Sequence, residues 1–435
     1  MVALIVTILI DTAVVKIYDV VDKNFIPPTY KLILFSINSL VSLFLKVLII
    51  RYVQRTIKSA PLKKALKTRF LYLFSLLTVL IVGCLIGSII FQMYYYHFYN
   101  HLLTRLIIAL SYGVGAVFII QLSLLFLSWY RSSRNSVVFL FFVSMSIIAF
   151  NLILTAVFID IRINDRPGHV VNYVGSGGDI SGYKYEALGN IYSVSSLVSF
   201  FSIWITTAIL MNNYRERLVS SLKNWVILSI PLVYFLITYF YQFFLARILT
   251  SYLEIDPVTV SIVLSAFLTL NKPIGGLLFA YAFWSIAKSV RYERNIKTYM
   301  IISGWGIFLI FTTNQAISQI LVPYPPFGLA TITIMNLASY LILVGVYDSA
   351  RLVSTNTRLR KSIYQQAIES KFLGPIGDAE MSKLVERTVK DVSKHRNILE
   401  LEEETKQRME LDQTELKKYV NFVIKEVHKE TSPNK

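Results

Sequence analysis

The sequence predicts an all-α protein: a polytopic membrane helix bundle followed by a short helical cytoplasmic tail. Hydrophobic residues make up 55% of the 435 residues and charged residues only 16%, against about a quarter charged in soluble proteins. Apolar runs of about 20 residues, long enough to cross a bilayer, also recur along the chain. Nine spans are expected, at 31–50, 70–93, 103–129, 136–159, 189–211, 224–247, 258–287, 298–321 and 328–347.

The segment before the first secure span, residues 1–30, is ambiguous. Met1 to Val15 is apolar except for Asp11, which makes it short for a span. It also lacks the basic start and small-residue cleavage site of a signal peptide. A tenth span, an interfacial helix and a shortened gene start all fit this pattern. Pro27 and Pro28 break the chain before the first secure span begins.

Lysine and arginine fall mainly on alternate connections between the spans. The odd-numbered connections hold sixteen of them: Arg51, Arg55, Lys58, Lys63, Lys64, Lys67, Arg69, Arg131, Arg134, Arg215, Arg217, Lys223, Lys288, Arg291, Arg294 and Lys297. The even-numbered connections hold five: Arg105, Arg162, Arg166, Lys184 and Arg247. Short basic loops are retained in the cytoplasm, so the odd connections and the C-terminus are predicted to lie inside.

The expected spans and the charge pattern together divide the chain into three parts. They also give no reason to expect a nucleic-acid partner. The parts are the N-terminal segment 1–30, a membrane domain at 31–350 and a cytoplasmic tail at 351–435. The formal net charge of +17 is mainly a topology signal, because the basic residues concentrate on the inside connections. The lipid bilayer is therefore the expected partner of the membrane domain.

The residues that common enzymes need are missing from the sequence. Cys84 is the only cysteine, so thiolate zinc sites and Cys-ligated iron–sulfur clusters are excluded. No Walker, HExxH or GxSxG motif occurs. His97 and His101 would share one face of a helix, but two ligands do not make a metal site. We expect no enzyme, no cofactor and no metal.

The strongest candidate site lies at Asn271 and Lys272, near the middle of the seventh expected span. Pro273, Gly275 and Gly276 follow directly and loosen the helix there. A lysine at bilayer depth costs about 2.5–3.5 kcal/mol on insertion scales and usually faces a bundle interior or a wet cavity. A proline kink in which the lysine contacts neighbouring carbonyls is the structural alternative to a ligand site.

Polar residues in the last two spans add to this candidate site. Asn314, Gln315 and Gln319 make one end of the eighth span polar, and Asn336 lies in the ninth. Such amides commonly form hydrogen bonds between helices. The sharper interpretation joins them with Lys272 in one ligand-binding pocket.

The tail alternates helix-forming segments with helix breakers. The ninth helix is expected to continue to Leu373, with Gly374-Pro375-Ile376-Gly377 ending it and Asp378 capping the next helix. A second amphipathic helix is expected from Asp412. Their apolar faces need a partner, either the chain's own bundle or another membrane-protein subunit.

The segments around residues 290–395 resemble a known protein family. The sequences YMIISGWGIFLIFTTNQA, PYPPFGLATITI, SYLILVGVYDSARLVSTNTRLRKSI and FLGPIGDAEMSKLVERTV are similar to those of a multi-span membrane protein family of ammonia-oxidising archaea (Thaumarchaeota). The resemblance implies an archaeal cell membrane location and a shared architecture. It brings no activity with it.

Two kinds of function fit these observations. A sensor, adaptor or non-catalytic subunit would pass the state of the bundle to the tail. A secondary transporter would be built around Lys272. The first is favoured, because no carboxylate that could couple transport to protons is expected in a secure span at the depth of Lys272.

Overall fold

A computed structural model describes residues 1–20, 27–59, 66–165, 182–213, 225–237, 257–290, 294–316, 325–356 and 372–402. Every regular element in these ranges is a helix, which confirms the all-α prediction. Long apolar sequences favour helices in a membrane because a helix satisfies its own backbone hydrogen bonds. The elements are α1 (Val2–Val20), α2 (Pro28–Ser59), α3 (Leu66–Tyr96), α4 (His101–Ser133), α5 (Ser136–Asp165), α6 (Gly182–Asn213), α9 (Pro257–Ser289), α10 (Arg294–Ala316), α11 (Leu329–Ile332), α12 (Ile334–Thr355) and α14 (Leu373–Glu402).

Seven helices in the described ranges are long and apolar enough to cross a membrane. They lie in α2 to α6, in α10 and in the α11–α12 pair, where seven of the expected spans were placed. Of the sixth expected span only the helix Trp225–Ile237 is described. In α9, which covers the seventh, the side chains before Leu270 lie outside the described part. The count of nine therefore stays a prediction.

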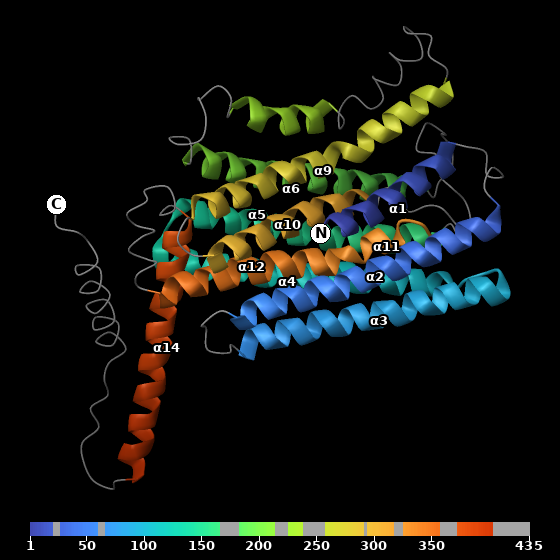
Figure 1. The fold of residues 1–435 in the computed structure, drawn as a ribbon. Coiled ribbons are helices and arrows are strands. Elements are labelled where there is room, and N and C mark those ends of the chain that lie inside the picture. The colour runs from blue at the N-terminus through green and yellow to red at the C-terminus, as the bar shows by residue number, and fades with distance from the viewer. Residues whose placement is uncertain are drawn as a thin grey trace.

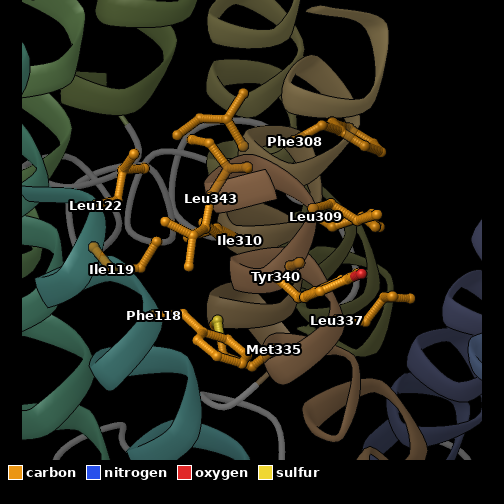
Figure 2. Packing of buried hydrophobic residues seen from close by; sticks show 14 of the residues in the cluster. Phe118, Ile119, Leu122, Phe308, Leu309, Ile310, Met335, Leu337, Tyr340 and Leu343 are labelled. Carbon is orange, nitrogen blue, oxygen red and sulfur yellow. The ribbon is translucent and has the colours of Figure 1, made fainter. Parts of the chain in front are cut away.

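Helix α12 forms the centre of the bundle (Figure 1), where it packs against α4, α10 and α14. From Leu329 to Ala350 every residue is buried, as expected of a helix that is covered on all sides. Figure 2 shows α12 side chains packed against α4 residues such as Phe118 and against Phe308 and Leu309 of α10.

Glycines bring the α10 and α12 backbones unusually close together. A Cβ added at Gly306 would lie 2.5 Å from the Ile342 nitrogen, and one at Gly345 would lie 2.6 Å from the Tyr299 carbonyl oxygen. Small residues allow such backbone contact between membrane helices, where dispersion and interhelical hydrogen bonds drive packing. Helices α10 and α12 therefore form a tightly packed pair.

Helix α1 packs against the bundle through one of its faces. Its Leu4, Ile8 and Asp11 are buried, and the helix packs against α2, α9 and α11. Val2 and Leu9, on the other side of the helix, are exposed, which suits contact with lipid. Whether this helix is a tenth span or an interfacial helix stays a prediction.

Helix α14 begins at one end of the bundle and then extends away from it (Figure 1). The expected order of helix and breaker is wrong here, because α12 ends at Thr355 and Gly374-Pro375-Ile376-Gly377 forms the first turn of α14. Proline is tolerated in a first turn, where backbone N–H groups have no partner within the helix. The amphipathic helix expected from Asp412 lies outside the described residues.

The two histidines thought to share a helical face do not share a helix. His97 follows the end of α3 with φ 52°, and His101 is the first residue of α4. Among the described residues, no group of three His, Cys, Asp or Glu side chains lies together as a metal site would require.

Candidate functional site

Lys272 lies at the middle of α9, half-buried, and its ammonium group contacts an aromatic side chain of α6. Its Nζ is 3.4 Å from the Tyr192 hydroxyl and 5.5 Å from the centre of that ring. The Tyr192 ring stacks on Phe158 of α5 at 5.0 Å. No carboxylate among the described side chains forms a salt bridge with Lys272. The lysine thus retains donor capacity for an anionic group.

A chain of amides and hydroxyls joins α10, α5 and α6. The Nδ2 of Asn314 donates to the Asn151 Oδ1 at 3.0 Å, and the Asn151 Nδ2 donates to the Ser195 hydroxyl at 3.0 Å. Ser195 lies one helical turn from Tyr192, the partner of Lys272. Asn314 therefore makes the interhelical hydrogen bond expected of it. Asn151, a lone amide that was not among the predicted site residues, is the centre of the network.

The other predicted site residues are either buried with unpartnered amide atoms or lie outside the described side chains. Asn271 is buried, and its Oδ1 has no hydrogen-bond partner among the described residues. Asn336 is buried in α12, and neither of its amide atoms has a partner there. The Gln315 side chain and the whole of Gln319 lie outside the described part of the chain.

A second polar site, around Asp11, lies where the last span is broken into α11 and α12. The Asp11 carboxylate accepts hydrogen bonds from the Gly328 N–H at 2.9 Å, the Thr331 N–H at 3.0 Å and the Thr331 hydroxyl at 2.7 Å. Gly328 is the N-cap of α11 and has φ 88°, a left-handed conformation that favours glycine. No side chain of this segment caps α11, so a carboxylate from another helix takes that role.

The same site contains a buried lysine, Lys46 of α2. Its ammonium group donates to the Thr333 hydroxyl, which lies between α11 and α12, and it interacts electrostatically with Asp11. Lys46 is 1% exposed and lies within about one turn of the middle of the span Thr29–Thr56. Each of the two buried groups is hydrogen-bonded, Asp11 to Gly328 and Thr331 and Lys46 to Thr333, which offsets part of the cost of burial.

Two carboxylates are buried in the described part of the bundle, but neither belongs to a secure expected span at the depth of Lys272, so the expectation for that depth stays a prediction. Asp11 is 1% exposed, and Asp348 of α12 is fully buried with neither carboxylate oxygen hydrogen-bonded among the described residues. Lys46 has no proline or glycine beside it to indicate a break in its helix, and Asp348 lies one residue beyond the expected end of the last span, so neither was predicted as a site residue. The sequence does contain a signal for such residues, because any ionisable residue inside an apolar run is a candidate site residue.

The first turns of α14 are packed into the end of the bundle opposite α11. Glu380 is 3% exposed, and its Oε2 accepts a hydrogen bond at 2.9 Å from the Trp129 Nε1 of α4. Phe372 lies 5.0 Å from Phe141 and 6.2 Å from Phe283, in ring contacts with α5 and α9. These contacts fix the start of the tail to three helices of the bundle.

Close contact between α14 and α12 completes this junction. A Cβ added at Gly377 would lie 2.3 Å from the Val353 Cγ1, so the two helices meet with no space for a larger side chain. The Lys383 ammonium lies 5.8 Å from the Trp129 ring. One buried helix, α12, thus contacts the Asp11–Lys46 site near one end and the tail near the other.

Comparisons with protein family models, curated proteins and solved structures find no match to this chain. What the chain does must therefore be argued from its own geometry.

Proposed function

We propose that this chain is a sensor or adaptor of the archaeal cell membrane, a non-catalytic subunit that passes the state of its helix bundle to a cytoplasmic tail. The observation that carries the proposal is the position of α12. This helix joins the buried polar site of Asp11 and Lys46 to the buried start of α14, and it is covered on all sides.

Helix α12 is long enough to transmit a displacement from the Asp11 site to the start of α14. Its 22 residues span about 33 Å at 1.5 Å per residue. The close backbone contacts with α10 at Gly306 and Gly345 restrict its sideways movement, because packed interiors deform little. A shift of α12 at the Asp11 site therefore moves Val353, which touches Gly377 of α14.

The orientation of this relay follows from the charge pattern of the connections. The basic odd-numbered connections belong inside, which puts α11 toward the outer half of the membrane and α14 in the cytoplasm. The tail would then present its remaining length to other subunits of a membrane complex.

Hydrogen exchange in the full chain, reconstituted in lipid nanodiscs, tests the proposed relay. Asp11→Asn and Thr331→Val weaken the cap of α11 without touching α14. We expect amide exchange over residues 372–385 to accelerate at least about fivefold, the lower range of typical coupling between sites. Arg105→Gln is the control, because it removes the Arg105–Asp160 ion pair between α4 and α5 and leaves α12 alone. Unchanged amide exchange over residues 372–385 in both Asp11→Asn and Thr331→Val would refute the relay.

A secondary transporter is the second candidate, and the ionisable residues deep in the bundle favour it. Asp11 and Lys46 lie beside the break between α11 and α12, and Lys272 lies beside Pro273 in the middle of α9. Broken helices with charged groups at mid-depth are typical of transporter binding sites. Substrate-dependent currents in proteoliposomes that disappear in Lys272→Met would favour transport over relay.

A further inference from the structure

The polar atoms around Lys272 include buried acceptors that lack donors. The Oδ1 atoms of Asn271 and Asn314 are buried and have no hydrogen-bond partner among the described residues, and both side chains are at least nine-tenths buried. The Tyr112 hydroxyl of α4 is in the same state. In a membrane bundle each such group costs free energy unless something bonds it.

The packing of α9 on α10 brings these groups to one level. A Cβ added at Gly276 would lie 3.0 Å from the Phe311 Cβ and 3.1 Å from the Phe308 carbonyl oxygen. Because the two helices run in opposite directions, residues one to two turns before Gly276 lie level with residues just after Phe311. Asn271 and Lys272 are therefore level with Asn314.

The hydrogen bonds place the remaining groups around the same level. Asn314 reaches Ser195 through Asn151, and Ser195 is one turn from Tyr192, which contacts Lys272. Tyr112 lies within electrostatic range of Tyr192. Polar side chains from five helices are thus linked to the region of Lys272, whose ammonium group contacts Tyr192 and has no described carboxylate partner.

We infer that this cluster binds a small organic anion that also carries a hydrogen-bond donor, such as a hydroxy acid. The ammonium of Lys272 takes the carboxylate, as a charged donor prefers an ionised acceptor. The single hydroxyl hydrogen of the same molecule is donated to the Asn271 oxygen. This inference is independent of the relay, because binding is measured without reference to the tail.

Thermal unfolding of the full chain in detergent, with three matched probes, tests the inference. Glycolate carries a carboxylate and a hydroxyl, acetate lacks the hydroxyl, and ethylene glycol lacks the carboxylate. We expect glycolate to raise the Tm by about 2 °C or more at saturation, acetate to raise it less, and ethylene glycol to leave it unchanged.

Single substitutions distinguish the role of the Lys272 ammonium from that of the Asn271 oxygen. Lys272→Met should abolish the glycolate and acetate shifts, whereas Lys272→Arg should retain part of them. Asn271→Leu should keep the acetate shift and lose the extra shift from glycolate. Lys288→Met, at an exposed lysine of the same helix, is the control and should respond as the wild type does.

Three results would overturn the inference. One is the absence of any shift with glycolate in the wild type, which would leave water as the occupant of the cluster. Another is an equal shift with acetate and glycolate, which would remove the donor requirement. The last is a glycolate shift that persists in Lys272→Met. If Lys272→Met does not fold, the Asn271→Leu and Lys272→Arg results still decide.

Discussion

The carboxylate of Asp11 accepts two hydrogen bonds from Thr331, one from the backbone N–H at 3.0 Å and one from the hydroxyl at 2.7 Å. A third bond, from the Gly328 N–H, makes Asp11 the cap of a helix that lies more than 300 residues away in the sequence. Lys46, on a third helix, donates to Thr333 of the same segment and interacts electrostatically with Asp11. This site fixes the start of the α11–α12 pair.

A double-mutant cycle on Asp11 and Lys46 should show strong coupling between them. Asp11→Leu and Lys46→Met should each lower the free energy of unfolding by about 3–5 kcal/mol, since each leaves a buried charge without its partner. The double variant should lose much less than the sum, because no charge remains buried. Thermal or denaturant unfolding in detergent measures all three, and additive losses would contradict the pairing.

Gly328→Ala should destabilise the bundle through the backbone alone. The φ of 88° at this position costs an L-residue about 1–2 kcal/mol. Gly113→Ala is the matched control, because a Cβ there meets no atom within 4 Å and alanine favours a helix. Equal unfolding temperatures for the two variants would mean that the left-handed conformation at Gly328 is not required.

Cysteine labelling in intact cells should reveal the orientation of the chain. In a Cys84→Ser background, cysteines at Ser132 and Ser289 should be shielded from an impermeant thiol reagent, because both positions belong to basic connections predicted inside. A cysteine at Ser176, on an even-numbered connection, should react. Labelling of either inside position without permeabilisation would reverse the topology.

Gly377→Leu should release the start of the tail from the bundle. The new side chain has no room beside Val353, where even a Cβ would lie 2.3 Å from the Cγ1. Limited proteolysis should then cleave within residues 372–390 at a rate at which the wild type stays intact. Gly87→Leu adds the same bulk where no atom lies within 4 Å of the new Cβ, so its tail should resist as in the wild type. Equal resistance of the Gly377 variant would show that the junction is not closely packed.

The helices could be predicted from the sequence, but the contacts between them could not. Apolar length predicts a membrane helix because the bilayer imposes that length locally, so most spans were found within a few residues. The pairing of Asp11 with Thr331, or of Glu380 with Trp129, depends on which helices become neighbours, and no local pattern contains that information. Asn151 was overlooked for the same reason, since a lone amide becomes a network centre only when Asn314 and Ser195 face it.

The start of α14 differs from its prediction for another reason. Gly374 and Pro375 were interpreted as a break between helices, but in a first turn the missing proline donor costs nothing. The small residues that suggested a linker instead allow α14 to approach α12 at Gly377. Composition alone does not distinguish a breaker from a site of close packing.

The reciprocal exchange experiment tests the central claim, that α12 couples the Asp11 site to the tail. Coupling between two sites is symmetric in free energy, so a change at the tail must be felt at α11. Glu380→Gln weakens the bond to Trp129 and leaves Asp11 and its partners in place. Amide exchange over residues 328–333, measured in nanodiscs, should accelerate in Glu380→Gln, just as exchange over residues 372–385 is expected to accelerate in Asp11→Asn. Exchange at 328–333 that matches the wild type, while the tail itself is loosened, would contradict the claim.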